Sequence, residues 1–510
     1  MSFSRVYSAQ SVLLEGRIIA IETDLSRGLY AFNIVGLPDK AVEESRDRVS
    51  AAIKNSGFES PKSKNQKVVV SLAPADIKKE GPLFDLPIAL SYLLNAEEVV
   101  FDPNDKIFIG ELSLDGSLQK VNGVLPLIIE AKKNNFKEIY VPKENVLEAA
   151  LIDGIEVYGA ENLKDIVKHL NKQIKDFSLK KSPKTKIRLQ QETGDVLFED
   201  IRSQERAKRG LEIAAAGGHN LSMYGPAGTG KTMLAKAFSS ILPPLEFNEM
   251  IEVTSIYSVS GNLNKGLITR PPFRSPHHTS SHISVVGGGA TPKPGEITLA
   301  HKGVLFLDEF PEFDKRVLES LRQPLEDRVV SISRARGKAV FPANFILIAA
   351  MNPCPCGNFG TDKDCKCSQI SIERYRRKLS GPIVDRIDLW IEVPRIKHKE
   401  LLEKTVSSPR LNKERVEKIK KVREIQKKRL SKIKKSLNAE MSARDIGNLI
   451  ELDKKSKEIL ENAGEKLKLS PRSFHKVIKV ARTIADLEGR EEILDSDILE
   501  ALQYRPKIEY

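Results

Sequence analysis

A glycine-rich stretch that ends in a lysine and a threonine is the clearest chemical signal in this sequence of 510 residues. It fits the phosphate-loop pattern G-x-x-x-x-G-K-[ST] and reads Gly225-Pro226-Ala227-Gly228-Thr229-Gly230-Lys231-Thr232. In such a loop, backbone N–H groups surround a phosphate, the lysine reaches the outer phosphates and the hydroxyl ligates Mg²⁺. The apolar Asn220–Tyr224 and the helical pattern of Met233–Phe238 supply the strand and helix that flank such a loop. The sequence therefore predicts a site for ATP and Mg²⁺.

Two further apolar stretches end in polar residues that suit hydrolysis of a bound nucleotide. Val304–Leu307 runs into Asp308 and Glu309, and Phe345–Met351 runs into Asn352. Continuous apolar runs are typical of buried parallel strands, whose carboxyl ends form ligand sites. We expect Asp308 to help Thr232 hold Mg²⁺, Glu309 to activate the attacking water and Asn352 to position that water. The second acid favours hydrolysis over binding alone.

All four cysteines of the chain lie within fourteen residues, as Cys354, Cys356, Cys365 and Cys367. Four thiolates suit a tetrahedral zinc ion, although structural zinc sites more often use C-x₂₋₄-C than C-x-C spacing. Such an ion would shape the loop after Asn352 and support the nucleotide site. The alternative is four free thiols, since disulfides are disfavoured in a reducing compartment.

Composition and charge narrow the class of protein. The chain is 40% hydrophobic and 30% charged, as in globular proteins, and no apolar run approaches the ~18 residues of a membrane span. Met1–Gly16 lacks the apolar stretch of a signal peptide, so we expect a cytoplasmic protein without a membrane partner. Of the net charge of +13, the segment Lys397–Glu440 contributes ten, with 16 basic and 6 acidic residues. This segment is either a surface for a phosphate backbone or a solvated helix.

The patterns predict an α/β protein with a helical C-terminal part. Residues 1–170 form one α/β domain, 171–192 a polar, lysine-rich linker, 193–394 a second α/β domain, and 395–510 a helical region. Within the first domain we expect strands at Arg17–Thr23, Tyr30–Val35, Lys67–Leu72 and Ile107–Glu111. Helices are expected there at Asp39–Asn55, Asp85–Asn95 and Gly123–Lys133.

The first domain resembles the proteolytic domain of Lon, which has an α/β fold of the ribosomal S5 domain 2 type. The stretches that carry the resemblance are Glu80–Asp85, Gly110–Gly116, Asn122–Leu125 and Ile139–Asn145. At the position of the Lon serine this chain has Leu83, and at that of the Lon lysine it has Leu125, and neither side chain is a nucleophile or a base. The domain is therefore similar to the non-proteolytic N-terminal domain of magnesium-chelatase-like proteins.

The second domain resembles AAA+ ATPases, in which an arginine of the neighbouring subunit completes each site. Here the stretch Gly381–Asp388 is similar to the one that carries this arginine, which makes Arg386 the candidate. A second arginine of that family lies in a helical lid. Leu469–Phe474 matches its place and makes Arg472 the candidate.

Nearly the whole chain resembles the YifB/ComM family of bacterial magnesium-chelatase-like AAA+ ATPases. The supporting stretches are Phe273–Ser281, Gly287–Gly289, Pro294–His301, Leu321–Glu326, Asn352–Gly357 and Val480–Leu487. The resemblance implies a homo-hexameric helicase that drives branch migration on branched or single-stranded DNA during natural transformation. Ser203-Gln204 and Ser281-His282 depart from the Gly-Gln and Ser-Asp pairs usual in the family.

A hairpin is expected at Val329–Phe341, with Arg334, Arg336 and Lys338 in its turn. In related helicases such a hairpin enters the central channel, where three cations suit a track of phosphates. The alternative is a contact between subunits. The basic helix Arg410–Lys435 is a second candidate surface. Rival functions are a protein remodeller with the Lon-like domain as docking module, and a motor subunit of magnesium chelatase.

Overall fold

The computed structural model describes residues 3–171, 177–186, 196–263, 266–289, 292–334, 337–359, 363–396 and 409–506, without the side chains of 334, 337 and 338. The chain divides into two compact units. The first unit comprises Met1–Arg188 with Met250–Ile268, and the second comprises Leu189–Glu249 with Thr269–Tyr510. The segment Met250–Ile268 thus belongs to the first unit, although it lies inside 193–394 in the sequence. In the described part of the chain, no helix is long and apolar enough to cross a bilayer.

A seven-stranded mixed sheet forms the first unit, in the order β3-β4-β2-β1-β5-β8-β9. β1 and β2 pair antiparallel, as do β2 and β4, whereas β1, β5, β8 and β9 run parallel. The strands are β1 (Phe3–Val12), β2 (Glu15–Arg27), β3 (Ala31–Val35), β4 (Gln66–Ala73), β5 (Lys106–Phe108), β8 (Glu138–Pro142) and β9 (Glu156–Ala160). The helices are α1 (Lys40–Asn55), α2 (Asp85–Asn95), α3 (Val124–Lys133), α4 (Val146–Ala149), α5 (Leu163–Leu170) and the part of α8 (Phe247–Val259) from Met250 onward. The α/β fold expected for this region is confirmed, with strands and helices within a few residues of the predicted positions.

The two positions that match the Lon serine and lysine carry leucines with structural contacts. Leu125 is fully buried in α3, and its backbone N–H donates to Glu148 Oε1 at 2.9 Å. Leu83 lies in a single 3₁₀ turn, and its carbonyl oxygen accepts from the N–H of Gly110 at 3.0 Å. Neither position offers the hydroxyl or amine of a Ser–Lys dyad.

A five-stranded parallel sheet forms the centre of the second unit, in the order β11-β14-β17-β10-β18. Its strands are β11 (Phe273–Arg274), β14 (Val304–Leu307), β17 (Ile346–Met351), β10 (Leu221–Tyr224) and β18 (Leu389–Glu392). Every residue of β14 and β17 is buried, which explains their unbroken apolar sequences. Because the strands are parallel, the segments that follow β10, β14 and β17 emerge at one edge of the sheet.

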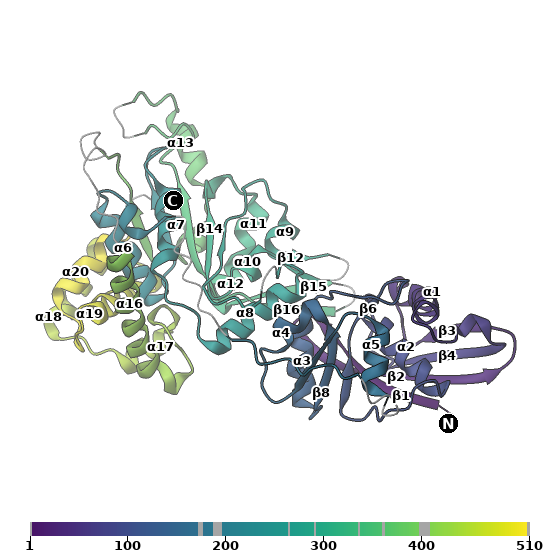
Figure 1. Ribbon diagram of the computed structural model, residues 1–510. Coiled ribbons are helices and arrows are strands. Elements are labelled where there is room, and N and C mark those ends of the chain that lie inside the picture. Colours follow the sequence, from purple (N-terminus) through teal and green to yellow (C-terminus); the bar gives the residue numbers. More distant parts are fainter. Residues whose placement is uncertain are drawn as a thin grey trace. The chain divides into compact units, whose positions relative to one another are not determined.

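Helices cover this sheet and continue into the C-terminal helical region (Figure 1). They include α6 (Glu205–Gly217), α7 (Lys231–Ile241), α9 (His282–Val286), α10 (Glu296–Leu299), α11 (Lys315–Ser320), α12 (Arg322–Asp327), α13 (Gln369–Arg376) and α14 (Gly381–Val384). The C-terminal helices are α16 (Pro409–Leu430), α17 (Ala443–Leu449), α18 (Lys454–Lys466), α19 (Pro471–Leu487) and α20 (Asp495–Gln503). The expected helical region is therefore confirmed in its described part.

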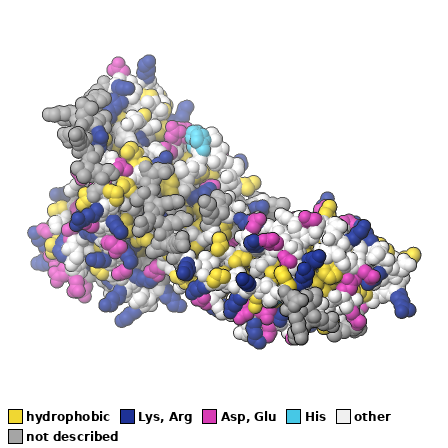
Figure 2. Space-filling model, viewed as in Figure 1, with side chains coloured by type: hydrophobic (Ala, Val, Ile, Leu, Met, Phe, Trp, Pro, Cys, Tyr) yellow, Lys and Arg dark blue, Asp and Glu magenta, His cyan; other side chains and the backbone are white. Residues whose placement is uncertain are grey.

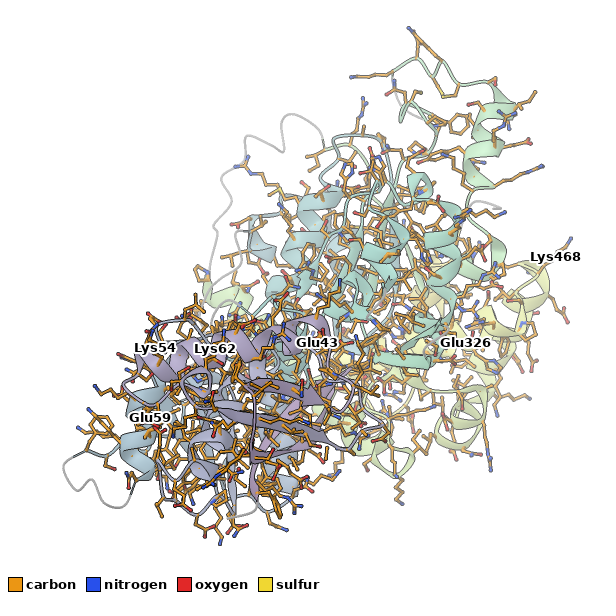
Figure 3. The ribbon with its side chains drawn as sticks, turned by 90° about the vertical axis from the view of Figure 1, so that its right-hand side faces the viewer. Glu43, Lys54, Glu59, Lys62, Glu326 and Lys468 are labelled. Atoms are coloured by element: carbon orange, nitrogen blue, oxygen red, sulfur yellow. The ribbon has the colours of Figure 1, made fainter. Side chains whose placement is uncertain are left out.

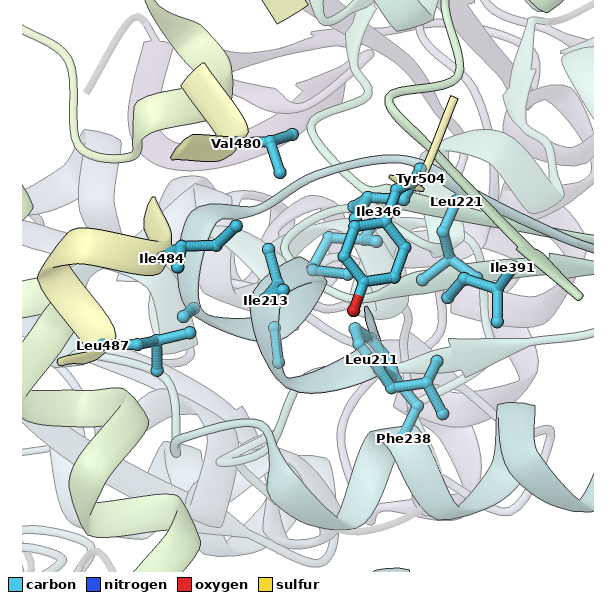
Figure 4. Close-up of a cluster of buried hydrophobic side chains, with 14 of the residues drawn as sticks. Leu211, Ile213, Leu221, Phe238, Ile346, Ile391, Val480, Ile484, Leu487 and Tyr504 are labelled. Atoms are coloured by element: carbon cyan, nitrogen blue, oxygen red, sulfur yellow. The ribbon is translucent and has the colours of Figure 1, made fainter. Parts of the chain in front are cut away.

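One hydrophobic cluster joins the sheet to the C-terminal helices (Figure 4). Leu221 of β10 and Ile391 of β18 contribute from the sheet, and Ile213 contributes from α6. Ile484 and Leu487 contribute from α19. The C-terminal helices are thus held by the same core as the sheet, and their positions depend on it.

A hairpin of β15 (Val329–Arg334) and β16 (Gly337–Pro342) follows α12, as predicted. Its strands pair antiparallel from Val329 opposite Pro342 to Arg334 opposite Gly337. Arg336 and the side chains of Arg334 and Lys338, which were expected to contact phosphates, lie outside the described residues.

Candidate functional site: a nucleotide cleft and a four-cysteine cluster

The glycine-rich loop connects β10 to the start of α7. Gly228 and Gly230 have φ values of +76° and +89°, in a backbone region that residues other than glycine rarely adopt. A Cβ on Gly225 would lie 2.2 Å from the carbonyl oxygen of Val393, so this position also requires glycine. The loop ends at Gly230, directly before Lys231, which is the first residue of α7. The N-terminus of a helix attracts phosphate, because its backbone N–H groups are free to donate.

Lys231 is buried beneath this loop. Its Nζ donates to the carbonyl oxygens of Gly225 and Pro226, both at 2.8 Å, and to Asn352 Oδ1 at 3.1 Å. Burial lowers the pKa of Lys231 to about 8, against a smaller opposing effect of Asp308. The contact between Lys231 and Asn352 joins the loop to the end of β17.

Thr232 and Asp308 meet across the cleft, because Asp308 directly follows β14. The Thr232 hydroxyl donates to Asp308 Oδ2 at 2.7 Å, and Asp308 Oδ1 accepts the N–H of Glu309 at 2.9 Å. A hydroxyl and a carboxylate at this distance are suitable oxygen ligands for one Mg²⁺ ion. Glu309 has a φ of +51°, a left-handed conformation that is uncommon outside glycine and asparagine and that is often found at functional sites.

His278 contacts Glu309 directly, with 3.2 Å between Nδ1 of the imidazole and Oε2 of the carboxylate. The ring of His277 lies beside that of His278, with 4.2 Å between their centroids. The contact of His278 with Glu309 was not predicted from the sequence, because the two residues lie 31 positions apart and only folding brings them together. The adjacent pair of histidines in an otherwise polar stretch was the one available signal.

These residues line an open cleft of about 740 Å³. Its walls include most of the glycine-rich loop, both acids that follow β14, and the segment after β11. The lining residues are Ala227, Gly228, Thr229, Gly230, Lys231, Thr232, Met233, Ser275, Pro276, His277, His278, Phe306, Asp308, Glu309 and Asn352. The structure thus brings the predicted loop, acids and asparagine into one site large enough for a nucleotide.

The two predicted arginines do not line this cleft and meet elsewhere. Arg386 and Arg472 both pair with Glu326 of α12, which is labelled in Figure 3. Arg472 lies 3.7 Å from the carboxylate oxygen that also pairs with Arg386. The Arg386 side chain is 13% exposed, and its Nη1 donates to the carbonyl oxygen of Pro382 at 2.8 Å. Glu326 was not predicted from the sequence as the partner of both arginines.

The four cysteines converge in the loop between β17 and α13. Their sulfur atoms all lie within 4.8 Å of one another. The distances from Cys354 to Cys356 and Cys365 are 3.4 and 3.8 Å, and Cys356 and Cys365 are 3.6 Å apart. A tetrahedral zinc ion with Zn–S bonds of about 2.3 Å separates its sulfurs by about 3.8 Å, so the cluster fits this ion.

The cysteine loop also lies close to the nucleotide loop. Gly357 has a φ of +77°, and a Cβ there would lie 3.3 Å from the Cβ of Ala227. Cys354 is only two residues from Asn352, which binds Lys231. A change in the shape of the cysteine loop is therefore expected to affect the phosphate loop at these two places.

The basic helix α16 uses several of its cations inside the second unit. Arg415 pairs with Glu199 at 2.9 Å, and Arg429 pairs with Asp486 at 2.6 Å. Arg423 donates to the carbonyl oxygen of Ala215. The exposed lysines of this helix are Lys413, Lys418, Lys420, Lys421, Lys427 and Lys428. On the face shown in Figure 2, basic and acidic side chains are interspersed.

Three protein-family models that describe subunits of magnesium chelatase match the chain. "Magnesium chelatase, subunit ChlI" matches residues 197–401, "Subunit ChlI of Mg-chelatase" matches 21–145, and the ChlI C-terminal model matches 412–505. Competence protein ComM of Haemophilus influenzae is 43% identical, across 100% of this chain and 98% of its own length. YifB of Escherichia coli is 40% identical, across 99% and 97%. Lon protease 2 of Bacillus subtilis is 29% identical across 27% of this chain.

Proposed function

Because the chain belongs to the family of magnesium-chelatase-like AAA+ ATPases that includes ComM and YifB, we propose that it is a Mg²⁺-dependent motor that moves along DNA. Its substrates are branched or single-stranded intermediates of recombination or natural transformation. The observation that carries the ATPase part is the meeting of Lys231, the Thr232–Asp308 pair and Glu309 in one cleft. The full-length similarity to ComM carries the DNA part.

Each residue of the cleft has a distinct task in this proposal. Lys231 exchanges its carbonyl partners for the outer phosphates of ATP, which need its positive charge. Thr232 and Asp308 hold Mg²⁺, which when bound neutralises charge on the phosphates. Glu309 accepts the proton of the attacking water as general base, and Asn352 positions that water.

The proposed enzyme works as a ring, and a homo-hexamer is the form that the resemblance to the YifB/ComM family implies. Arg386 and Arg472 lie at Glu326, outside the cleft of their own chain, so we infer that Arg386 completes the cleft of a neighbouring subunit. A guanidinium in that place stabilises the charge that develops on the transferred phosphoryl group.

The four cysteines are proposed to hold one structural zinc ion as thiolates. The sulfur spacing and the donor set support this, because four soft thiolates select zinc over Mg²⁺. This proposal goes with a cytoplasmic location, since a reducing compartment disfavours disulfides between these cysteines.

Two rival functions have their own support. Similarity of part of the chain to Lon protease 2 favours a protein remodeller that docks substrates on the first unit. The family models favour a motor subunit of magnesium chelatase.

One comparison of ATPase rates separates these functions. The purified protein is assayed alone, with a synthetic four-way DNA junction, with linear duplex, and with an unfolded protein, and Glu309→Gln supplies the hydrolysis-dead control. The DNA motor predicts stimulation that is largest for the junction. Stimulation by unfolded protein alone would establish the remodeller, and a rate unchanged by every polymer would reject the DNA motor.

A further inference from the structure

Helix α12 is attached to the β15–β16 hairpin by one side-chain amide. The Nε2 group of Gln323 donates to the hydroxyl of Ser331 at 3.1 Å, and Gln323 Oε1 accepts the N–H of Ser331, also at 3.1 Å. Both ends of the amide are therefore used on a single residue of β15. Such a reciprocal pair fixes the distance and the orientation of the two elements better than one bond would.

The connection along the chain between α12 and the hairpin is equally short. Arg328 alone separates the last residue of α12 from the first residue of β15. It has a φ of +58°, and its N–H donates to the carbonyl oxygen of Pro324 at 3.1 Å. Arg328 links α12 to β15 along the chain, and the Gln323–Ser331 pair joins the same two elements a second time. A movement of the hairpin must therefore also move α12.

One turn after Gln323, Glu326 holds both candidate arginines. The same carboxylate oxygen pairs with Arg386, which follows α14, and with Arg472 in the first turn of α19. Burial on its own would raise the pKa of Glu326, but the two guanidinium groups outweigh it, and the pKa lies below its usual value. The carboxylate is thus ionised and draws two cations from different elements to one point.

The Nε atom of Arg386 is buried and makes no hydrogen bond with the described residues. Its guanidinium is therefore held through Nη1, by the carbonyl oxygen of Pro382, and through Nη2, by Glu326. The Pro382 contact lies four residues away on the same turn, and Asn220 contacts only the backbone carbonyl of Arg386. Among the described residues, Glu326 is therefore the partner that ties the guanidinium of Arg386 to another element.

We propose that α12 couples the hairpin to hydrolysis: through Gln323 it follows the hairpin, and through Glu326 it positions Arg386 and Arg472. This inference rests on the proposed function, because it requires Arg386 to act on ATP and the hairpin to contact DNA. Glu326 is a positioning residue and touches no nucleotide of its own cleft. Binding of a polynucleotide to the hairpin changes the placement of both arginines and thereby the turnover rate.

Three full-length variants test the two contacts separately. Glu326→Gln keeps the size of the side chain and removes the charge that holds the arginines. Gln323→Ala removes the attachment to Ser331. Asp327→Asn removes a charge one residue away from Glu326, on the exposed end of the same helix, and is the matched control. For each variant, kcat, KM for ATP and stimulation by a synthetic four-way junction are measured, and the melting temperature reports folding.

The expected pattern differs for each variant. Glu326→Gln lowers kcat about tenfold or more, whereas KM stays near that of the unmodified chain, as expected when only transition-state contacts are lost. Gln323→Ala retains the basal rate and loses most of the stimulation by DNA. Asp327→Asn matches the unmodified chain in every respect.

Two results would overturn the inference. One is a folded Glu326→Gln variant with unchanged kcat, and the other is a Gln323→Ala variant that DNA stimulates fully. If the unmodified chain itself shows no stimulation by DNA, the proposed DNA function and the coupling role of Gln323 both fail. The kcat of Glu326→Gln still decides in that case whether Glu326 positions the arginines.

Discussion

Nδ1 of the His278 imidazole lies 3.2 Å from Oε2 of Glu309. An ionised carboxylate only accepts hydrogen bonds, so His278 can act on Glu309 as a donor when Nδ1 carries a proton. Both side chains line the nucleotide cleft, and the backbone of Glu309 is left-handed. A donor in this position would fix one oxygen of the proposed general base and leave the other to accept a proton from water.

Substitutions of His278 separate its role as a donor from its role as a wall of the cleft. The amide nitrogen of Asn reaches the place of Nδ1, whereas that of Gln reaches the place of Nε2. We therefore expect His278→Asn to retain most of kcat, and His278→Gln and His278→Ala to lose about tenfold with little change in nucleotide affinity. His282→Ala is the control, since His282 lies outside the lining of the nucleotide cleft. Equal rates for the Asn and Gln variants would refute the orienting role.

Nucleotide affinity should weaken as the pH rises through the pKa of Lys231. Burial holds this pKa at about 8 in the empty cleft, and a triphosphate favours the charged ammonium. Binding above this pH therefore requires uptake of a proton, so we expect the Kd to be about tenfold larger at pH 9 than at pH 7. Isothermal titration with ADP across this range measures it.

The control for this pH dependence is Lys231→Arg, whose guanidinium stays charged throughout the range. Its affinity is expected to be weaker than that of the unmodified chain, but nearly independent of pH. A Kd of the unmodified chain that does not change between pH 7 and 9 would show that Lys231 is fully charged in the empty cleft.

Removal of the metal from the four cysteines should disturb the nucleotide site as well as the fold. We expect about one zinc per chain by elemental analysis of protein prepared without chelators. Chelation or Cys365→Ser should lower the melting temperature and weaken nucleotide binding, because Gly357 of this loop lies close to Ala227 of the phosphate loop. Purified protein without zinc would leave the cysteines as ordinary thiols of the loop.

Arg386 should act on the site of a neighbouring subunit. Arg386→Ala is expected to bind nucleotide and to lose hydrolysis by about 10³-fold or more. In an equal mixture with Lys231→Ala, about a quarter of the interfaces in a ring join an intact lysine to an intact arginine. The mixture should therefore regain part of the ATPase rate. If mixed rings form and remain inactive, Arg386 does not act between subunits.

Much of the second unit follows from sequence patterns that are local. The strand predicted at Asn220–Tyr224 is β10, the apolar stretch before Asp308 is β14, and the one before Asn352 is β17. Because parallel strands have their carboxyl ends at the same edge of the sheet, the sequence alone predicts that the residues after these strands form one cleft. The contact of Thr232 with Asp308 is the direct consequence.

Other relationships depend on tertiary packing and have no local signal. Glu326 lies 60 residues before Arg386, and an isolated Glu in a short helix does not indicate a partner. Helix α8 is continuous from Phe247 to Val259, yet Met250 onward belongs to the first unit. Periodicity predicts such a helix but not the core on which its apolar side packs.

The β15–β16 hairpin gives the most direct test of DNA contact. If Arg334, Arg336 and Lys338 neutralise phosphates, their contribution is independent of base sequence and sensitive to salt. Each lost contact lowers the slope of log affinity against log salt by about 0.7–0.9, so replacing all three with Ala should flatten it by roughly two units.

Basal ATPase should persist, since none of the three belongs to the nucleotide cleft. Branch migration should stop, because the hairpin no longer binds the DNA strand while ATP is hydrolysed. A triple variant that binds and moves DNA normally would shift attention to the exposed lysines of α16, such as Lys418 and Lys421.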